Sequence, residues 1–203
     1  PYDVSALLCG QLLAQMPDGV AVRRVLAGIA QGAAAPVLAI AGPQSDWSLD
    51  GDGVVAERQG GGWVLNGVKR RVPFGAGAAQ LLVAARDGRD VALFLIEAGE
   101  RNAISGVTRQ GAAGVDGRSY ADIVFSACRV SGDARLGVAD AALEQAADTT
   151  RIALCAEALG AMQALLDATR DHAAARRQFG RALNGFQAVP VSYTHLRAHE
   201  TRG

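Results

Sequence analysis

The 203-residue sequence predicts an α+β fold with short N-terminal helices, a middle antiparallel β-barrel or sandwich, and the start of a C-terminal helical bundle. Two observations lead to this prediction. Residues 36–135 contain short apolar runs separated by Gly and Asp turns, which is typical of antiparallel strands. Beyond Gly137 the apolar residues follow helical spacing, with no proline between Pro73 and Pro190. Because strands do not alternate with helices, a Rossmann domain is not expected.

Residues 1–35 are predicted to form two short helices. Apolar residues recur at helical spacing in residues 4–16, and Pro17 breaks that pattern before a second helix at 20–31. The sequence has no initiator Met and starts directly in a helical pattern. We therefore expect an N-terminally truncated piece of a longer protein.

The middle region predicts several short strands. Strands are expected at 63–65, 81–85, 91–96 and 121–130. The first follows the run Gly60-Gly61-Gly62, and an Asp-Gly turn at 87–90 precedes the third.

The region after residue 136 predicts one long helix. A helix of about 40 residues would be roughly 60 Å long. Since most helical stability comes from tertiary burial, such a helix needs partners from a missing C-terminal bundle or from oligomerisation. Its predicted apolar stripe is Leu143, Ala147, Thr150, Leu154, Ala158, Met162, Leu165, Leu166 and Thr169.

Composition favours a protein that acts on small molecules. Formal charge is zero and no basic block is present, which argues against nucleic-acid or anionic-membrane partners. No signal peptide is visible and no uninterrupted apolar run reaches ~18–20 residues, so no membrane span is expected. Cys9, Cys128 and Cys155 are interpreted as reduced core residues, which suits a cytoplasmic location.

The most informative motif is the run Arg176-Arg177-Gln178-Phe179-Gly180, followed by Gln187. A guanidinium fork, an aromatic ring and amides are groups suited to a planar cofactor that carries phosphate. The alternative is that these arginines merely solvate a helix C-terminus, where the helix dipole favours cations.

This motif resembles the RxQFG…FQ signature of the acyl-CoA dehydrogenase family. Four further segments, at 65–69, 117–125, 135–137 and 156–162, are similar to family motifs in the same order. The resemblance implies the end of an N-terminal helical domain at 1–35, a middle β domain at 36–135, and the first part of a C-terminal bundle at 136–189. A non-enzymatic β-domain binding module is the least favoured alternative.

The resemblance also implies chemistry: FAD as cofactor and α,β-dehydrogenation of an acyl-CoA thioester. Electron-transfer flavoprotein would be the acceptor and a homo- or heterotetramer the assembly. By residue match, the positions that would contact FAD are Arg176, Gln178, Phe179, Gln187, Ile40, Ala41 and Ser45. Arg151 matches an arginine beside the substrate and the catalytic base, although it could also be an ordinary helix cation.

Several positions depart from the family pattern. Ala41 replaces a flavin-contacting threonine, Gly42 replaces an acid, and Pro73 stands where the family has a Thr in its Trp-Ile-Thr segment. Thr150 occupies one family position of the catalytic carboxylate, so we expect no base in this chain. These changes resemble the pimeloyl-CoA dehydrogenase small-subunit branch and the paired subunits of sterol side-chain degradation. The alternative function is therefore a non-catalytic partner subunit that completes a neighbour's FAD site.

Residues 190–203 break the pattern and are interpreted as a non-native tail of translated adapter sequence. His195 and His199 have the i, i+4 spacing of a helical metal pair, with Glu200 adjacent. A third ligand and a scaffold are missing, so no metal site is expected.

Overall fold

The computed structural model describes residues 2–44, 49–98 and 105–187. The chain forms two compact units, Pro1–Thr150 and Arg151–Gly203. The predicted α+β class is confirmed, with helices at the N-terminus, a sheet in the middle and the long helix α3 (Asp140–Ala175) after it.

The N-terminal helical region consists of η1 (Tyr2–Cys9), α1 (Gly10–Ala14) and α2 (Val20–Ala30). The first predicted helix thus has a π-helical first part that continues into α1. Gly19 adopts extended backbone directly before α2, which separates the two helices. Their buried side chains are Leu12, Leu13, Val22 and Val25.

The middle region forms an eight-stranded sheet in the order β6-β7-β3-β2-β4-β5-β8, with β1 paired to β4. The antiparallel prediction needs correction, because β1 pairs in parallel with β4. β2 meets β4 at a single residue pair, Val55 with Arg86, so most of that side of β4 is open to β1. The bounds are β1 (Val37–Ala39), β2 (Val54–Gln59), β3 (Gly62–Pro73), β4 (Gln80–Asp87), β5 (Asp90–Glu97), β6 (Val107–Ala113), β7 (Ser119–Val130), η3 (Gly132–Ala134) and β8 (Arg135–Val138).

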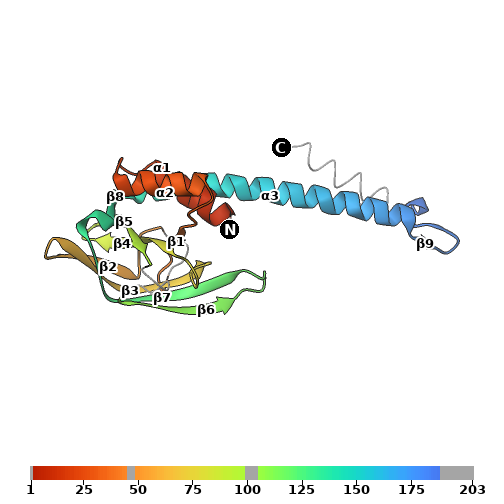
Figure 1. Ribbon diagram of the computed structural model, residues 1–203. Coiled ribbons are helices and arrows are strands. Elements are labelled where there is room, and N and C mark those ends of the chain that lie inside the picture. The colour runs from red at the N-terminus through yellow and green to blue at the C-terminus, as the bar shows by residue number, and fades with distance from the viewer. Residues whose placement is uncertain (1, 45–48, 99–104, 188–203) are drawn as a thin grey trace. The chain divides into compact units, whose positions relative to one another are not determined.

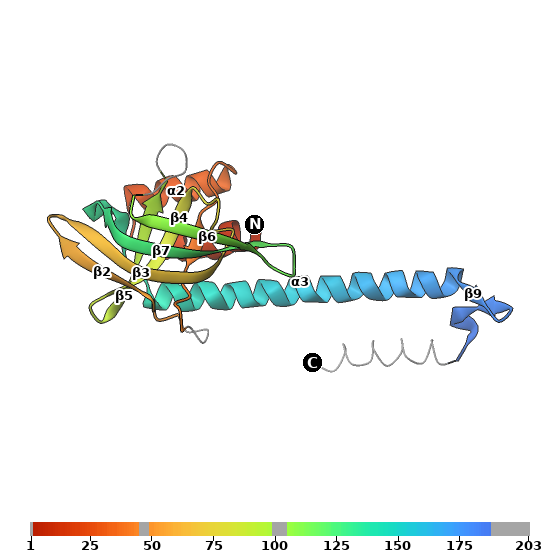
Figure 2. The same ribbon diagram turned by 90° about the horizontal axis from the view of Figure 1, so that it is seen from below.

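β4 and β5 are buried on both faces, because successive side chains of a strand point to opposite sides. Val83 and Phe94 face a core formed with β2, β3 and β7. Leu82 and Leu93 face a second core, which α1, α2 and the start of α3 cover. Figure 1 shows these helices on one side of β4 and β5, and Figure 2 shows β3 and β7 side by side.

The second unit contains most of α3, and its apolar side chains are largely exposed. Met162 is 52% exposed and Leu165 is 68% exposed. Among the described helices, only α3 is long and apolar enough to cross a membrane, a test that core helices of soluble proteins also pass. Cys9 and Cys128 are buried as predicted, but Cys155 is exposed because it lies on this uncovered part of α3.

Candidate functional site

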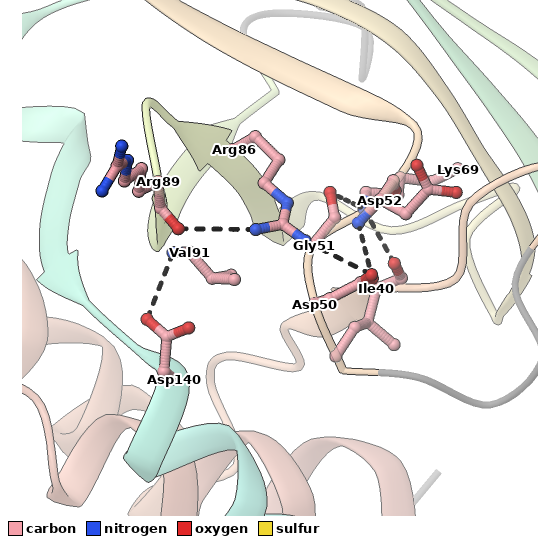
Figure 3. Close-up of polar contacts among 9 residues, drawn as sticks. All are labelled: Ile40, Asp50, Gly51, Asp52, Lys69, Arg86, Arg89, Val91 and Asp140. Carbon is pink, nitrogen blue, oxygen red and sulfur yellow. Dashed lines mark hydrogen bonds and ion pairs between the residues drawn. The ribbon is translucent and has the colours of Figure 1, made fainter.

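Lys69 on β3 is the centre of the first candidate site. Its side chain is 0% exposed. Its Nζ donates to the carbonyl oxygens of Ile40 at 2.7 Å, Gly51 at 3.0 Å and Asp52 at 2.5 Å (Figure 3). An ammonium group has three donors, so these carbonyls use all of them. Lys69 therefore holds both ends of segment 40–53, which begins with two of the predicted cofactor residues.

The backbone on either side of Lys69 closes the same segment. The N–H of Val68 donates to the Gly53 carbonyl at 2.7 Å, and the N–H of Arg70 donates to the Ala41 carbonyl at 2.7 Å. Gly53 has φ +88°, and a Cβ there would lie 2.4 Å from the Val68 oxygen. The close approach of segment and strand therefore requires glycine at this position.

A series of polar contacts runs from this segment towards the N-terminus of α3 (Figure 3). Arg86 pairs with Asp50 at 3.3 Å, and its Nη1 donates to the Arg89 carbonyl at 3.4 Å. The N–H of Val91 then donates to Asp140 Oδ2 at 3.1 Å. Because the Arg86–Asp50 pair is partly exposed, it adds little stability by itself. The pair does, however, place the Arg86 guanidinium near Lys69.

The environment of Lys69 shifts its protonation equilibrium. Burial lowers the pKa of Lys69 from 10.5 to about 7; the carboxylates of Asp52 and Asp50 oppose this shift, whereas Arg86 reinforces it. A neutral amine would keep two donors and leave one of the three carbonyls without a partner. Lys69 is thus held by geometry while its charge is destabilised by burial.

Segment 71–73, which matches the family's Trp-Ile-Thr segment, lies at a bulge in β3. The register with β7 shifts here. Arg71 has φ 50°, and its N–H donates to Asp122 Oδ1 at 2.9 Å. A bulge redirects side chains: Val72 is 1% exposed, whereas Arg71 is exposed. Pro73 ends the strand and offers neither a hydroxyl nor an N–H.

A cavity of about 530 Å³ lies beside the end of this bulge. Gln80 is its main polar side chain: Nε2 donates to Glu97 Oε1 at 2.7 Å. The buried Oε1 of Gln80 has no hydrogen-bond partner among the described residues. The cavity therefore combines apolar side chains with the polar side chains of Ser5, Gln80 and Glu97 in its wall, a composition common in ligand sites. Its apolar lining includes Val4, Val37, Phe74 and Ala78.

The second candidate site is a hairpin in the second unit. Strands β9 (Arg177–Gln178) and β10 (Arg181–Ala182) pair antiparallel. Phe179 and Gly180 connect them with φ 52° and 80°. Positive φ at both central residues of a two-residue loop is the requirement of a type I′ turn, and glycine favours it. The glycine of the sequence motif therefore forms the tip of this hairpin.

The hairpin presents the predicted cofactor side chains to solvent. Arg176, Gln178 and Gln187 are exposed, and Phe179 is 91% exposed. The short helix η4 (Leu183–Gly185) follows, and the Phe186 ring beyond it contacts the Phe179 ring edge-on, with centroids 6.4 Å apart. One local structure thus gathers guanidinium, amide and aromatic groups that can bind a phosphate and a planar ring.

Thr150 and Arg151 are neighbours on α3. The Thr150 hydroxyl donates to the Ala146 carbonyl at 2.8 Å, a common bond of threonine within helices. Arg151 is exposed at the start of the second unit. Thr150 therefore offers no carboxylate at the position where the family can carry its base.

The structure brings together some of the predicted site residues. Ile40 and Ala41 lie against β3 in the first unit. Gln178 and Phe179 belong to the hairpin, Arg176 directly precedes it, and Gln187 follows η4. Ser45 and residues 188–203, with both tail histidines, lie outside the described residues. Within the described part of the chain, no group of His, Cys, Asp or Glu side chains could hold a metal ion.

Sequence reasoning missed Lys69, which entered only as one letter of a motif. A signal was present, because Lys69 is the single lysine among the chain's 20 lysine and arginine residues. One lysine in a chain that otherwise uses arginine suggests a position that requires a compact ammonium group.

Three comparisons relate this chain to known proteins. The family model of the acyl-CoA dehydrogenase C-terminal domain matches residues 136–201. Isovaleryl-CoA dehydrogenase, mitochondrial, of Arabidopsis thaliana is 28% identical over 196 residues, which cover 93% of this chain and 48% of that protein. Both resemblances agree with the motifs in the sequence.

Solved structures share the fold. A glutaryl-CoA dehydrogenase from Mycobacterium smegmatis in complex with FADH2 matches with a TM-score of 0.85 at 20% identity, covering 95% of this chain and 50% of that one. The ChsE4–ChsE5 complex from Mycobacterium tuberculosis matches with a TM-score of 0.78 at 26% identity, covering 96% and 51%. This chain therefore spans about half the length of the relatives it matches.

Proposed function

Because this chain belongs to the acyl-CoA dehydrogenase family, we propose that it is part of an FAD-dependent enzyme that dehydrogenates an acyl-CoA thioester between Cα and Cβ. The observation that carries this proposal is the exposed hairpin with Arg176, Gln178 and Phe179 at its surface. FAD, when bound, supplies the redox chemistry by accepting a hydride from the substrate β-carbon. The described residues supply binding and orientation.

The hairpin fits the phosphate-bearing part of FAD. A guanidinium at Arg176 offers a planar pair of donors to pyrophosphate oxygens and stays charged at working pH. The amides of Gln178 and Gln187 add donors, and the exposed Phe179 ring adds an apolar face. Following the family pattern, we assign these groups to the FAD of a neighbouring subunit, in a homo- or heterotetramer.

The first unit fits the flavin ring only in part. Ile40 and Ala41 are fixed against β3 and can present backbone groups to a flavin edge. Ala41 and Pro73 carry no hydroxyl, and Pro73 has no N–H, so fewer donors are present than in the family pattern. Flavin binding here would depend on backbone groups and on the neighbouring subunit.

Removal of the substrate α-proton needs a carboxylate that we assign to a part of the protein outside this chain. Thr150 cannot accept the proton, since its hydroxyl is not basic and is bonded within the helix. The relatives are about twice as long as the region matched. Arg151 is proposed to lie beside the substrate and that carboxylate.

The second candidate function is a non-catalytic partner subunit that completes a neighbour's FAD site. Ala41, Pro73 and Thr150 favour it, because each lacks a group that the family uses in its own site. One matched structure is a complex of two different proteins, which agrees with a heteromeric assembly. We accordingly propose that this chain is related to the small-subunit branch of pimeloyl-CoA dehydrogenases.

Four finer statements accompany this proposal. The domains are placed at 1–35, 36–135 and 136–189, with 190–203 as a non-native tail. Electron-transfer flavoprotein is the proposed acceptor, and the cytoplasm the proposed location.

Flavin absorbance of the purified complete protein tests the proposal. The gene would be sequenced beyond both ends of the printed chain and expressed with and without its neighbouring dehydrogenase gene. Bound FAD with one gene product supports an autonomous dehydrogenase. Flavin bound only when both products are present supports the partner subunit, and no flavin in either preparation refutes both.

A further inference from the structure

We propose that Lys69 is a positioning residue of the cofactor site, which fixes residues 40–41 and 51–53 against β3 and so sets where the backbone of Ile40 and Ala41 lies. The inference rests on the proposed function for its link to FAD. Its structural half depends only on the contacts of the described residues.

Three consecutive residues of β3 hold this segment. Val68 and Arg70 use their backbone N–H groups, and Lys69 uses all three side-chain donors. Without the ammonium, the carbonyls of Ile40, Gly51 and Asp52 would lose their partner, and Gly51 is buried. Leaving a buried carbonyl unpaired costs about 1–3 kcal/mol, so the segment would relax towards other conformations.

A lysine is specifically suited to this position. Its ammonium is compact and directs three donors from one atom, whereas guanidinium is a larger planar fork. The chain uses arginine for every other cation, including the neighbouring and exposed Arg70 and Arg71. Among the described residues, Lys69 is the only charged side chain that is buried.

The link to the cofactor follows from the identity of the residues that β3 holds in place, Ile40 and Ala41. The Ile40 carbonyl accepts directly from Lys69, and the Ala41 carbonyl accepts from the next backbone N–H of the same strand. Because Ala41 carries no hydroxyl, any flavin contact at this position depends on backbone groups. The position of that backbone then decides whether the contact forms.

Hydrogen exchange of the 203-residue chain tests the structural half. Lys69→Met keeps a long apolar side chain and removes the donors, and Arg70→Met removes an exposed cation from the next position as the matched control. In Lys69→Met, amides of residues 41, 42, 44 and 49–53 should exchange about tenfold faster or more, the factor that one lost hydrogen bond gives. Amides of β4 and β5 should stay as protected as in the parent. Equal exchange in parent and variant would overturn the proposal.

Amine labelling of the unaltered chain decides the question if Lys69→Met fails to fold. Because Lys69 is the only lysine, the only amines that acetic anhydride can modify are this side chain and the α-amino group, and hydroxylamine removes acetyl groups from tyrosine and cysteine before counting. Under native conditions one acetyl group should add quickly, and the second only when the chain is unfolded. Rapid double labelling of the folded chain would refute a buried, hydrogen-bonded Lys69.

The flavin content of the complete protein, or of its complex, tests the cofactor half. Lys69→Met should retain about tenfold less FAD than Arg70→Met at the same free FAD concentration, the factor expected for one lost hydrogen bond. Faster exchange combined with unchanged FAD retention would overturn the link to the cofactor. A parent protein that binds no FAD refutes the proposed function, while exchange and labelling still decide the role of Lys69.

Discussion

Lys69 both donates hydrogen bonds to the backbone of the proposed site and has a shifted pKa. Its three acceptors are backbone carbonyls, so no single carboxylate neutralises the charge at close range. Burial dominates and lowers the pKa of Lys69 to about 7; Asp52 and Asp50 oppose this shift, and Arg86 reinforces it. The consequence is a group whose protonation differs between the folded and unfolded chain.

The stability of the protein should therefore rise with pH above neutrality. Between about pH 7 and pH 10.5 the unfolded chain holds the Lys69 proton that the folded chain has released. The free energy of unfolding should increase by about 1.4 kcal/mol per pH unit in this window and show no Lys69 dependence below it. Urea unfolding at three pH values would measure the slope.

Lys69→Met is the control for this prediction, because it removes this titration and leaves the cysteines and tyrosines unchanged. The difference in slope between parent and variant isolates Lys69. Identical slopes would show that the folded and unfolded pKa values of Lys69 coincide.

A second prediction for a single residue concerns Arg176. Arg176→Lys keeps the charge but replaces a planar fork by a single ammonium, so pyrophosphate should bind about tenfold more weakly or worse. The ratio of flavin to protein absorbance after gel filtration of the complete protein measures this. Arg170→Lys, on an exposed turn of α3 beside Asp167, is the matched control. Full flavin retention in Arg176→Lys would remove Arg176 from the site.

At the scale of elements, residues 40–42 and 51–53 pack closely against β3. Gly42 and Gly53 let two backbones approach: a Cβ on Gly42 would lie 2.7 Å from the Asp52 carbonyl carbon. The bulge in β3 follows immediately, where Arg71 has a left-handed backbone. Strand, segment and bulge together shape the proposed flavin-facing edge.

Substitution of Gly53 should therefore be costly. Gly53→Ala combines a left-handed φ with a backbone clash, so the free energy of unfolding should fall by roughly 2–4 kcal/mol. Gly88→Ala is the control, since Gly88 has φ +66° and a Cβ added there would meet no atom within 4 Å. Gly88→Ala should therefore lower the free energy of unfolding by only about 1 kcal/mol, the cost of the left-handed backbone. Equal losses in the two variants, measured by urea unfolding, would argue against the close approach at Gly53.

At the scale of the whole molecule, α3 is the element whose burial is incomplete. Ile152, Leu159, Met162 and Leu165 are each more than half exposed. Long helices gain most of their stability from packing an apolar face. In the proposed enzyme, the rest of the C-terminal bundle and neighbouring subunits would cover these side chains.

The isolated 203-residue chain should consequently self-associate. Sedimentation velocity should show species larger than a monomer, and the double variant Met162→Gln with Leu165→Gln should shift the population towards monomer. Val115→Gln removes an exposed apolar side chain in the first unit and should leave association unchanged. A monomeric parent chain at about 50 μM, well within the usual range for weak association, would contradict this expectation.

The same chain should not oxidise acyl-CoA. The carboxylate that takes the α-proton is proposed to lie outside it, and Thr150 cannot replace that group. Dye reduction with butyryl-, octanoyl- and isovaleryl-CoA in the presence of added FAD would measure this. Turnover by the 203-residue chain would show that it contains a base of its own.

The sequence by itself determined the class of the fold and the family. Helical spacing, tight turns and five ordered motifs identified the N-terminal helices, most of the longer strands and α3, because these signals are local in the chain. The strands β1 and β8 were missed because three or four residues carry little periodicity. The strands β2 and β6 were missed because they are mostly exposed and carry few apolar residues. Cys155 was misplaced because composition does not say which part of a helix is covered.

Only the tertiary structure decided how separate segments meet. The parallel pairing of β1 with β4, the bulge at Arg71 and the hairpin around Gly180 depend on contacts or backbone angles that no local pattern specifies. Lys69 is the clearest case: its three acceptors lie 17 to 29 residues away in the chain. A sequence motif can show that a lysine is present, whereas folding determines that its charge is buried and which carbonyls it binds.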